Sequence, residues 1–427
     1  MIPTALLTLL GLMLIAVPVA ASMGVLGLVL AKFYAFLPVS RAAGEVAWTA
    51  SNEFLLVALP LFILLGELLL RSGLAERMYD ALARWLAWLP GGLMHSNIAA
   101  CAMFAATSGS SVATAATVGT VALPQAQRFG YNERLFLGTL AAGGTLGILI
   151  PPSINMIIYA VLTNTSVPKL YLAGIIPGVL LALGFMFVVS LACLWRPSWG
   201  GERMRWSLAA ALAGLVHLLP PVGVFLVVVG SIYAGVATPT EAASLGVVAG
   251  LGLAAWNRTL NWPMLREALL GTMRSTGMIM LIVVAAYFLN FVMSSIGLTT
   301  RLTDVIQNLG LSKWQMLLAV IVFYVILGCF METLSLMITT IPVIAPVMQA
   351  LGFDMIWFGI VIIVLVETAL VTPPVGLNLF VVHNLRSEGS MNDVIIGVAP
   401  FVVAMFVLLG LLALFPQLAL WLPGVFS

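Results

Sequence analysis

The residues best suited to chemistry lie in one stretch, Thr107–Asn155. It opens with the hydroxyl-rich run Ser108–Ser111 and closes with a glycine-rich segment that contains Pro151 and Pro152. Each proline removes a backbone N–H, so a helix around this pair leaves carbonyl oxygens without intrahelical partners. Free carbonyls and nearby hydroxyls are the oxygen ligands that an alkali cation needs when it sheds its water. The stretch predicts a cation site. Neither the hydroxyl run nor the proline break contains a carboxylate, so we expect neutral ligands.

The same pattern occurs a second time. Pro373–Pro374 follow Pro151–Pro152 by 222 positions, and Ala242–Gly246 follow Ala20–Gly24 by the same interval. Gly/Pro-interrupted segments at matching positions of two halves are typical of a transporter's binding site. We predict two structural repeats, 1–200 and 223–427, with a link over 201–222. The re-entrant hairpins are expected at about 107–126 and 329–349, and the broken helices at about 132–162 and 355–383.

Composition places these elements in a membrane. Of the 427 residues, 62% are hydrophobic and 7% are charged, whereas about 25% of residues are charged in a soluble domain. We predict an all-α polytopic membrane protein with about 11 transmembrane helices and two re-entrant hairpins. The net charge of +2, without a basic patch, argues against nucleic acid as a partner.

The two repeats are expected to be inverted relative to each other. Inversion puts the basic segments Arg196–Arg205 and Arg258–Arg274 on opposite sides of the membrane. The positive-inside rule prefers both in the cytoplasm, so the sidedness of the termini stays open. Two amphipathic stretches, Gly73–Leu89 and Gly297–Leu309, are expected to lie in the membrane interface.

Acidic residues within apolar runs are candidates for function. Glu332, which corresponds to Ser110 in the first repeat, is either a functional intramembrane acid or a cap for backbone N–H groups at the hairpin tip. Glu367 either handles ions or holds the second broken helix to a neighbour. The run Thr238–Glu241 predicts a helix start with an acid in its first turn.

Four side chains are candidates for substrate contact: Ser111, Thr114, Asn155 and Asn378. The asparagines follow the two proline pairs and either bind substrate or bond to loose backbone. Thr114 is at helical spacing from Thr117, so its hydroxyl either faces the site or bonds back to its own helix. The histidines and cysteines show no metal-ligand spacing.

Five motifs in combination are specific to one family: Pro60–Glu67, Ser108–Ala116, Gly144–Ser153, Thr238–Ala242 and Thr372–Asn378. Through them the chain resembles, over nearly its full length, the large membrane subunit of the TRAP transporters (tripartite ATP-independent periplasmic transporters). The resemblance implies a sodium-driven secondary importer of organic acids, such as C4-dicarboxylates, sialic acid or other sugar and keto acids. It also implies a bacterial or archaeal cytoplasmic (inner) membrane.

The resemblance further implies two partners, a small four-helix membrane subunit and a periplasmic substrate-binding protein. The expected mechanism is an elevator motion of a transport domain against a scaffold. One implied sodium site comprises Ser108, Ser110, Gly147, Ile150 and Pro152. The other, which rests partly on repeat symmetry, comprises Met331, Glu332, Thr333, Ala369, Thr372 and Pro374.

Two other functions are alternatives. One is a stand-alone sodium- or proton-coupled dicarboxylate or citrate carrier that works without a binding protein. The other is a membrane-embedded enzyme, which is disfavoured because no nucleophile, base or metal ligands converge in the sequence. We therefore expect a transporter rather than an enzyme.

Overall fold

The computed structural model describes the chain except for residues 16, 37, 203–206, 299, 302–311, 330, 387 and 427. Every regular element in the described residues is helical, which confirms the predicted all-α class. The predicted amphipathic stretch Gly297–Leu309 falls largely outside the described residues. The helices of the first half are α1 (Ile2–Leu14), α2 (Val19–Tyr34), α3 (Ala43–Ser51), α4 (Ala58–Arg71), α5 (Leu74–Leu86), α6 (Leu93–Ser108), α7 (Ser111–Arg128), α8 (Glu133–Leu149), α9 (Ile154–Thr163) and α10 (Val167–Trp195).

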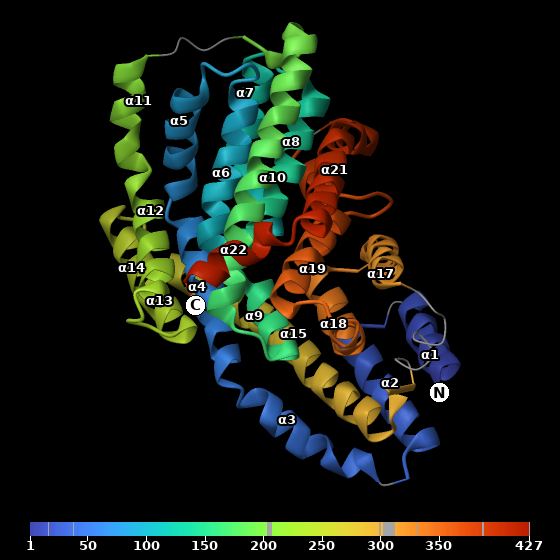
Figure 1. Ribbon diagram of the computed structural model, residues 1–427. Helices are drawn as coiled ribbons and strands as arrows, with labels where there is room; N and C mark the ends of the chain where they lie inside the picture. Colours follow the sequence, from blue (N-terminus) through green and yellow to red (C-terminus); the bar gives the residue numbers. More distant parts are fainter. Residues whose placement is uncertain are drawn as a thin grey trace.

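The second half continues the same architecture (Figure 1). Its helices are α11 (Leu208–Gly214), α12 (Leu219–Phe225), α13 (Ser231–Tyr233), α14 (Pro239–Trp256), α15 (Trp262–Ser295), α17 (Lys313–Gly328), α18 (Thr333–Ala350), α19 (Met355–Leu370), α20 (Leu377–Asn384), α21 (Met391–Leu414) and α22 (Gln417–Val425). Helix α14 begins with a capping box between Thr238 and Glu241. This confirms the helix start predicted there.

Helices in the two halves begin at matching positions. α7 and α18 start 222 positions apart, at Ser111 and Thr333. α8 and α19 start the same distance apart, at Glu133 and Met355. Each half then breaks at its proline pair before a short helix follows, α9 or α20. Both Pro–Pro peptide bonds are cis.

Among the described residues, five helices are long and apolar enough to cross a membrane, or seven spans if two bent pairs are counted. One bent pair is α8 with α9, at 43°, and the other is Ala211–His217 with Leu219–Tyr233, at 44°. The second pair places helix over residues 211–217 and 219–222 of the predicted link. The chain is a multi-pass membrane protein, and the number of about 11 crossings stays a prediction.

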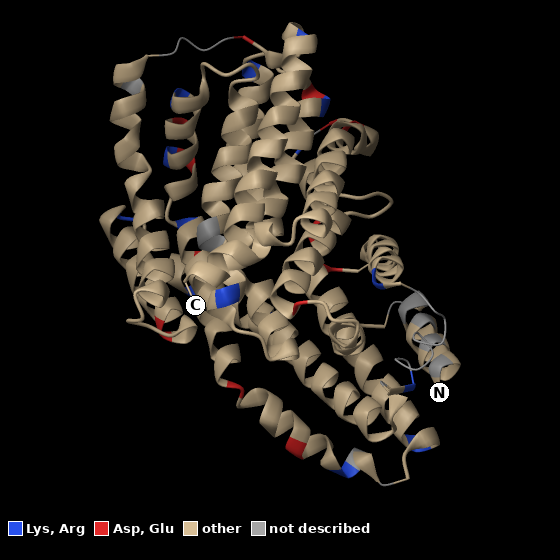
Figure 2. Ribbon diagram, in the orientation of Figure 1, with Lys and Arg blue, Asp and Glu red and all other residues tan. Residues whose placement is uncertain are grey.

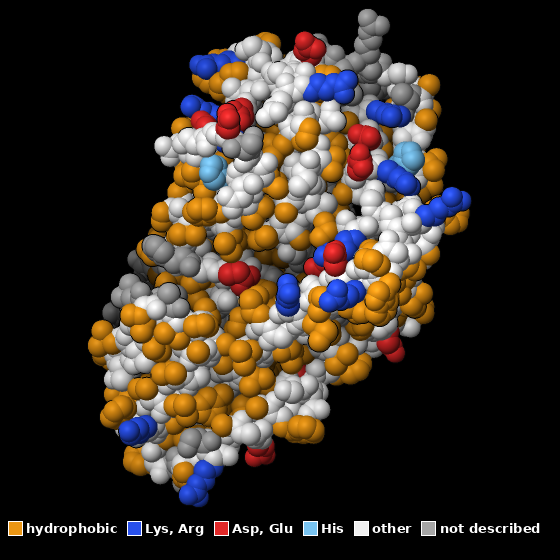
Figure 3. All heavy atoms as spheres, turned by 180° about the vertical axis from the view of Figure 1, so that it is seen from behind, with side chains coloured by type: hydrophobic (Ala, Val, Ile, Leu, Met, Phe, Trp, Pro, Cys, Tyr) orange, Lys and Arg blue, Asp and Glu red, His pale blue; other side chains and the backbone are white. Residues whose placement is uncertain are grey.

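The surface suits a lipid environment. Figure 2 shows that α8, α10 and α21 carry charged residues only near their first turns. Figure 3 shows broad hydrophobic areas on the opposite face of the molecule. On α10 and α21, Phe187 and Val403 are 67% and 62% exposed. Apolar areas of this extent are typical of surfaces that contact lipid or a partner.

The helices form a central bundle and a flanking layer (Figure 1). In the central bundle, α8 packs against α6, α7, α10, α19 and α21. In the flanking layer, α15 packs against α2, α3 and α4, and α4 also packs against α14. The two groups meet where α4 contacts α6 and α9, and where α15 contacts α18. This junction positions the candidate site.

Helix α5 packs against the protein along its apolar face. Its apolar face, which includes Leu74, Met78 and Leu82, is buried, and the helix packs against α6. Figure 1 shows α5 upright beside α6 rather than across the end of the bundle. The stretch is amphipathic as predicted, and protein covers its apolar face; its location in the membrane interface stays a prediction.

Two glycines let α8 and α21 cross at close range. A Cβ atom added to Gly138 would lie 2.1 Å from the carbonyl oxygen of Gly397, and one added to Gly397 would lie 1.9 Å from that of Arg134. Both neighbours are backbone atoms in a packed interior, so neither side can yield easily. At the end of the same crossing, Arg134 Nε lies 2.9 Å from Asp393 Oδ1. The crossing therefore requires glycine at both positions.

The substitution Gly397→Ala should lower the stability of the folded chain by about 1–3 kcal/mol, because the added methyl group overpacks the crossing. Gly410→Ala is the matched control, since Gly410 lies on the same helix and a Cβ there meets nothing within 4 Å. The control should be neutral or slightly stabilising, because alanine favours a helix over glycine by about 1 kcal/mol. The measurement is the apparent melting temperature in detergent. Equal melting temperatures for the two variants would contradict the close crossing.

Candidate functional site

A cavity of about 400 Å³ lies at the junction between the flanking layer and the central bundle. Helices α4 and α15 form one wall. The other wall is formed by the tip between α6 and α7, the break between α8 and α9, and the start of α18. Residues on this wall include Gly109, Ser110, Ser111, Ile148, Asn155, Glu332, Thr333 and Leu370.

The first hairpin tip packs directly on the first broken helix. The chain turns at Gly109, whose φ of 61° favours glycine. Ser110 then caps α7, and its Oγ accepts a hydrogen bond from the Ala113 N–H at 3.4 Å. A Cβ atom added to Gly147 would lie 2.8 Å from the carbonyl carbon and oxygen of Ser110. The tip can approach α8 this closely because residue 147 has no side chain.

The proline pair leaves polar backbone beside this tip. In a continuous helix, the carbonyls of Gly147 and Ile148 would accept hydrogen bonds from residues 151 and 152. Both residues are prolines and have no N–H to donate. The Pro152 carbonyl oxygen also faces the tip, 3.1 Å from where a Cβ of Gly109 would lie.

The structure thus brings together most of the first predicted ion set. Ser110, Gly147 and Pro152 meet at the tip, and Ile150 is the extended C-cap residue of α8. Ser108 is the last residue of α6, and its side chain is not among those described.

The second hairpin tip is organised by Glu332, the N-cap residue of α18. Its Oε2 accepts a hydrogen bond from the Ser335 N–H at 3.0 Å. The Thr333 hydroxyl donates to its Oε1, also at 3.0 Å. The capping role predicted for Glu332 is confirmed, and the residue also lines the cavity.

The second tip lies against the second broken helix. A Cβ atom added to Gly328 would lie 2.2 Å from the Ala369 side chain. The Cys329 thiol lies 3.3 Å from the carbonyl oxygen of Pro373, the residue before Pro374. Met331 is buried beside the cap. The Thr372 hydroxyl, just after α19, donates to the Thr368 carbonyl of that helix at 2.6 Å.

Three helix N-termini converge on the cavity. Helices α7, α9 and α18 begin at Ser111, Ile154 and Thr333, and each of these residues lines it. The first N–H groups of a helix have no intrahelical acceptor, and the helix dipole makes this end positive. Ser110 and Glu332 each accept one of these N–H groups as the caps of α7 and α18. The N–H groups that the caps leave unpaired favour a negatively charged ligand.

Glu367 was not assigned to either predicted site, yet the structure places it beside the first one. It is 0% exposed, and the Ser111 hydroxyl donates to its Oε1 at 2.7 Å. Its Oε2 has no hydrogen-bond partner among the described residues. Helix α19 of the other half therefore brings an acidic side chain next to the first tip, and the neutral ligand set expected for the cation stays a prediction. The predicted role of holding the broken helix to a neighbour is confirmed.

The four residues predicted to contact substrate separate into two pairs. Ser111 and Asn155 line the cavity, and the Asn155 amide also lies 3.6 Å from Met337 of α18. Thr114 is buried, and its hydroxyl donates to the Ser110 carbonyl at 2.7 Å. Asn378 is buried and donates to the Ala141 carbonyl at 3.2 Å, so it bonds to the backbone of α8. Neither Thr114 nor Asn378 lines the cavity.

Comparison with solved structures supports a transporter fold. The Alcanivorax borkumensis YdaH transporter superposes with a TM-score of 0.55 over 86% of both chains. Its sequence is 17% identical. At this identity the likeness concerns the fold alone.

Sequence comparisons are more specific. The family model of the tripartite ATP-independent periplasmic transporters, DctM component, matches residues 6–418. The C4-dicarboxylate TRAP transporter large permease protein DctM of Pseudomonas aeruginosa is 35% identical over 387 residues, which is 90% of each chain. The sialic acid TRAP transporter large permease protein SiaM of Vibrio cholerae is 31% identical over 382 residues, 88% of this chain and 87% of its own. These relatives are permeases, which agrees with the expectation of a transporter rather than an enzyme. The chain belongs to the TRAP transporter family, as a large permease subunit of the DctM type.

Proposed function

We propose that the chain imports organic acids by sodium-coupled secondary transport across a bacterial or archaeal cytoplasmic membrane. The observation that carries this proposal is the junction cavity onto which α7, α9 and α18 direct their N-termini. Helix N-termini stabilise carboxylates through unpaired N–H groups and the helix dipole. The substrates named for the relatives, C4-dicarboxylate and sialic acid, are of this chemical class.

The charges that line the cavity explain why cations would be needed. The lining contains two acidic residues, Glu67 and Glu332, and no Lys or Arg among the described residues. Glu67 pairs with Arg71, and Glu332 caps α18. An organic anion therefore meets no full positive charge from the lining. Bound sodium ions beside the cavity would supply this positive charge, so substrate binding would depend on sodium.

Two sodium sites fit the two breaks. The first would use Ser108, Ser110, Gly147, Ile150 and Pro152, and the second Met331, Glu332, Thr333, Ala369, Thr372 and Pro374. Carbonyls freed by proline are suitable ligands because they replace water without requiring a carboxylate. Glu367 would join the two sites, since it bonds to Ser111 beside one set and lies two positions before Ala369 of the other.

The arrangement is compatible with an elevator mechanism and inverted repeats. Helices α4 and α15 would belong to the scaffold, and the hairpins and broken helices to the moving domain. The 222-residue interval between matching helices supports a repeat. A cavity at the junction of the two groups would change its access when one group moves against the other.

The proposed partners are a small four-helix membrane subunit and a periplasmic substrate-binding protein. Membership of the TRAP family supports them over the alternative of a stand-alone carrier. The two possibilities differ in one observable. A stand-alone carrier would transport substrate when this chain alone is reconstituted.

The coupling ion can be identified by uptake measurements. Proteoliposomes that contain the complex, supplied with binding protein and labelled C4-dicarboxylate or sialic acid, should accumulate substrate only under an inward sodium gradient. Replacement of sodium by potassium should reduce uptake to the level of empty liposomes, because the larger ion does not fit the same ligand set. Equal uptake in potassium would exclude sodium coupling. Full uptake without the binding protein would favour the stand-alone carrier.

The contact between Gly147 and the first tip can be tested by adding a methyl group at residue 147. Gly147→Ala places a methyl group 2.8 Å from the Ser110 backbone, so the tip must move away from the freed carbonyls. The sodium concentration for half-maximal uptake should rise roughly tenfold, which corresponds to about 1.4 kcal/mol. Gly184→Ala on α10 is the control, because a Cβ there meets nothing within 4 Å. An unchanged sodium dependence in a well-folded Gly147→Ala protein would move the cation site elsewhere.

A further inference from the structure

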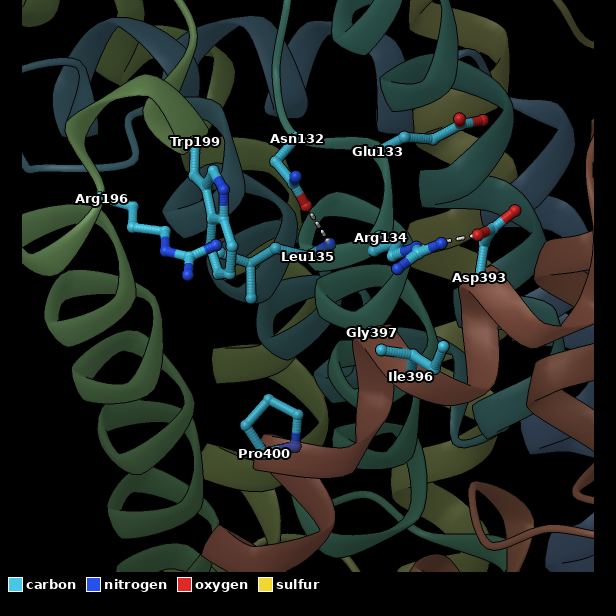
Figure 4. A pocket seen from close by; sticks show the side chains of 10 residues that line it. All are labelled: Asn132, Glu133, Arg134, Leu135, Arg196, Trp199, Asp393, Ile396, Gly397 and Pro400. Atoms are coloured by element: carbon cyan, nitrogen blue, oxygen red, sulfur yellow. Dashed lines mark hydrogen bonds and ion pairs between the residues drawn. The ribbon is translucent and has the colours of Figure 1, made fainter.

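A second cavity, of about 760 Å³, lies at one end of the central bundle, away from the junction. It is bounded by the start of α8, the start of α21 and the turn after α10 (Figure 4). Figure 4 shows Arg196 and Trp199 on one side and the Arg134–Asp393 pair on the other, with Ile396 and Pro400 below. The cavity thus combines a polar end with an apolar floor.

Arg134 and Arg196 are the two arginines that line this cavity, and Arg196 lies over aromatic rings. Its guanidinium lies 5.0 Å from the Trp199 ring centre and 5.7 Å from that of Trp195. Arg134, in contrast, is paired with Asp393. Arg196 has no acidic partner among the described residues. The two tryptophans hold the guanidinium in place and leave its N–H donors to a ligand.

Asn132 supplies a second donor. Its Oδ1 accepts a hydrogen bond from the Leu135 N–H at 3.0 Å and so caps α8. Its Nδ2 donates to no described residue. A guanidinium and an amide NH₂ group at the mouth of one cavity suit the oxygens of a phosphate.

An exposed apolar stripe leads away from this polar end. Ile396, Pro400, Val403 and Val407 follow each other at helical spacing on α21. Ile396, Val403 and Val407 are 52%, 62% and 56% exposed. The stripe begins at the cavity, because Ile396 and Pro400 form its floor. A ligand with a polar head and a long apolar tail would match both parts.

The length of α10 allows the cavity to lie at the depth of lipid headgroups. Helix α10 has 29 residues, so it is about 43 Å long and exceeds the hydrocarbon core of about 30 Å. It ends at Trp195, which is 81% exposed, and tryptophan is enriched at membrane interfaces. Arg196 is the next residue after Trp195, so it lies at the same end of α10.

We propose that this cavity binds an anionic glycerophospholipid. The phosphate would bond to Arg196 and Asn132, and one acyl chain would follow the stripe on α21. A lipid with net negative charge is favoured over a zwitterionic one. The ammonium group of a zwitterionic lipid would find no free carboxylate here, since Asp393 pairs with Arg134 and Glu133 pairs with Arg386.

The test compares two arginines in the full-length chain. Arg196→Gln removes the proposed phosphate ligand. Arg128→Gln is the matched control, because Arg128 also lies over an aromatic ring, Phe129 at 5.5 Å, has no described acidic partner, and does not line the cavity. The purified proteins are titrated with dioleoylphosphatidylglycerol or dioleoylphosphatidylcholine. Lipid adducts are counted by native mass spectrometry, and melting temperatures are recorded.

Wild type and Arg128→Gln should bind phosphatidylglycerol in preference to phosphatidylcholine and melt at a higher temperature with it. Arg196→Gln should bind phosphatidylglycerol about tenfold more weakly, as expected for the loss of a charge-assisted hydrogen bond. Equal binding by the two variants, or equal binding of the two lipids by wild type, would overturn the proposal.

Two further measurements identify the molecule that binds in the cavity. Val403→Ser makes the stripe polar and should weaken lipid binding without changing any effect of inorganic phosphate. Inorganic phosphate could stabilise wild type as much as phosphatidylglycerol does, with both stabilising effects unchanged in Val403→Ser. In that case the site takes a free anion and the lipid assignment is wrong. If the small subunit, once added, abolishes the phosphatidylglycerol adducts of wild type, this face is a protein interface and the proposal also fails.

Discussion

A helix inside a membrane cannot be interrupted unless its freed backbone groups find new partners, and this constraint governs the centre of the molecule. Pro151–Pro152 and Pro373–Pro374 break α8 from α9 and α19 from α20. Each break leaves carbonyls on one side, and the first also places a new helix N-terminus, that of α9, on the cavity. The two hairpin tips close on these breaks, with Gly109 and Gly147 at one tip and Glu332 at the other. Polar backbone is therefore gathered where protein rather than lipid surrounds it.

Such an arrangement would separate the two kinds of charge that the proposed sodium-coupled transporter binds. Helix N-termini line the cavity and favour an anion, whereas the carbonyls freed by proline are the proposed cation ligands. Glu367 is a wholly buried acidic side chain in this region, and Ser111 anchors it. A carboxylate held there with one oxygen unpaired is expensive in a membrane interior. Its position suggests that the two proposed ion sites are coupled rather than independent.

The sequence predicts the fold class and the positions of the breaks well, because these depend on local chemistry. Proline and glycine act on their own segment, so the helix ends at Leu149 and Leu370 could be anticipated from residues a few positions away. The cap formed by Glu332 and the helix start at Thr238 follow from the same local rules.

Features that depend on distant neighbours could not be predicted in this way. Glu367 meets Ser111 across 256 positions, and only its apolar surroundings marked it as unusual. The amphipathic pattern of α5 fits a lipid surface or a protein surface equally well, and only the packing of α6 decides between them. Thr114 and Asn378 are polar residues near the site, yet both bond to backbone and neither lines the cavity.

The most direct test of this account is a double-mutant cycle between Ser111→Ala and Glu367→Gln, read as the sodium concentration for half-maximal uptake in proteoliposomes. The hydrogen bond joins the first hairpin to α19, so each substitution alone should raise that concentration. The double variant should then be no worse than the more affected single variant, so the coupling energy equals the effect of the milder substitution, about 1 kcal/mol if that substitution raises the concentration about fivefold. If the two effects instead multiply as independent changes in proteins of unchanged melting temperature, the two halves do not share one ion-binding unit.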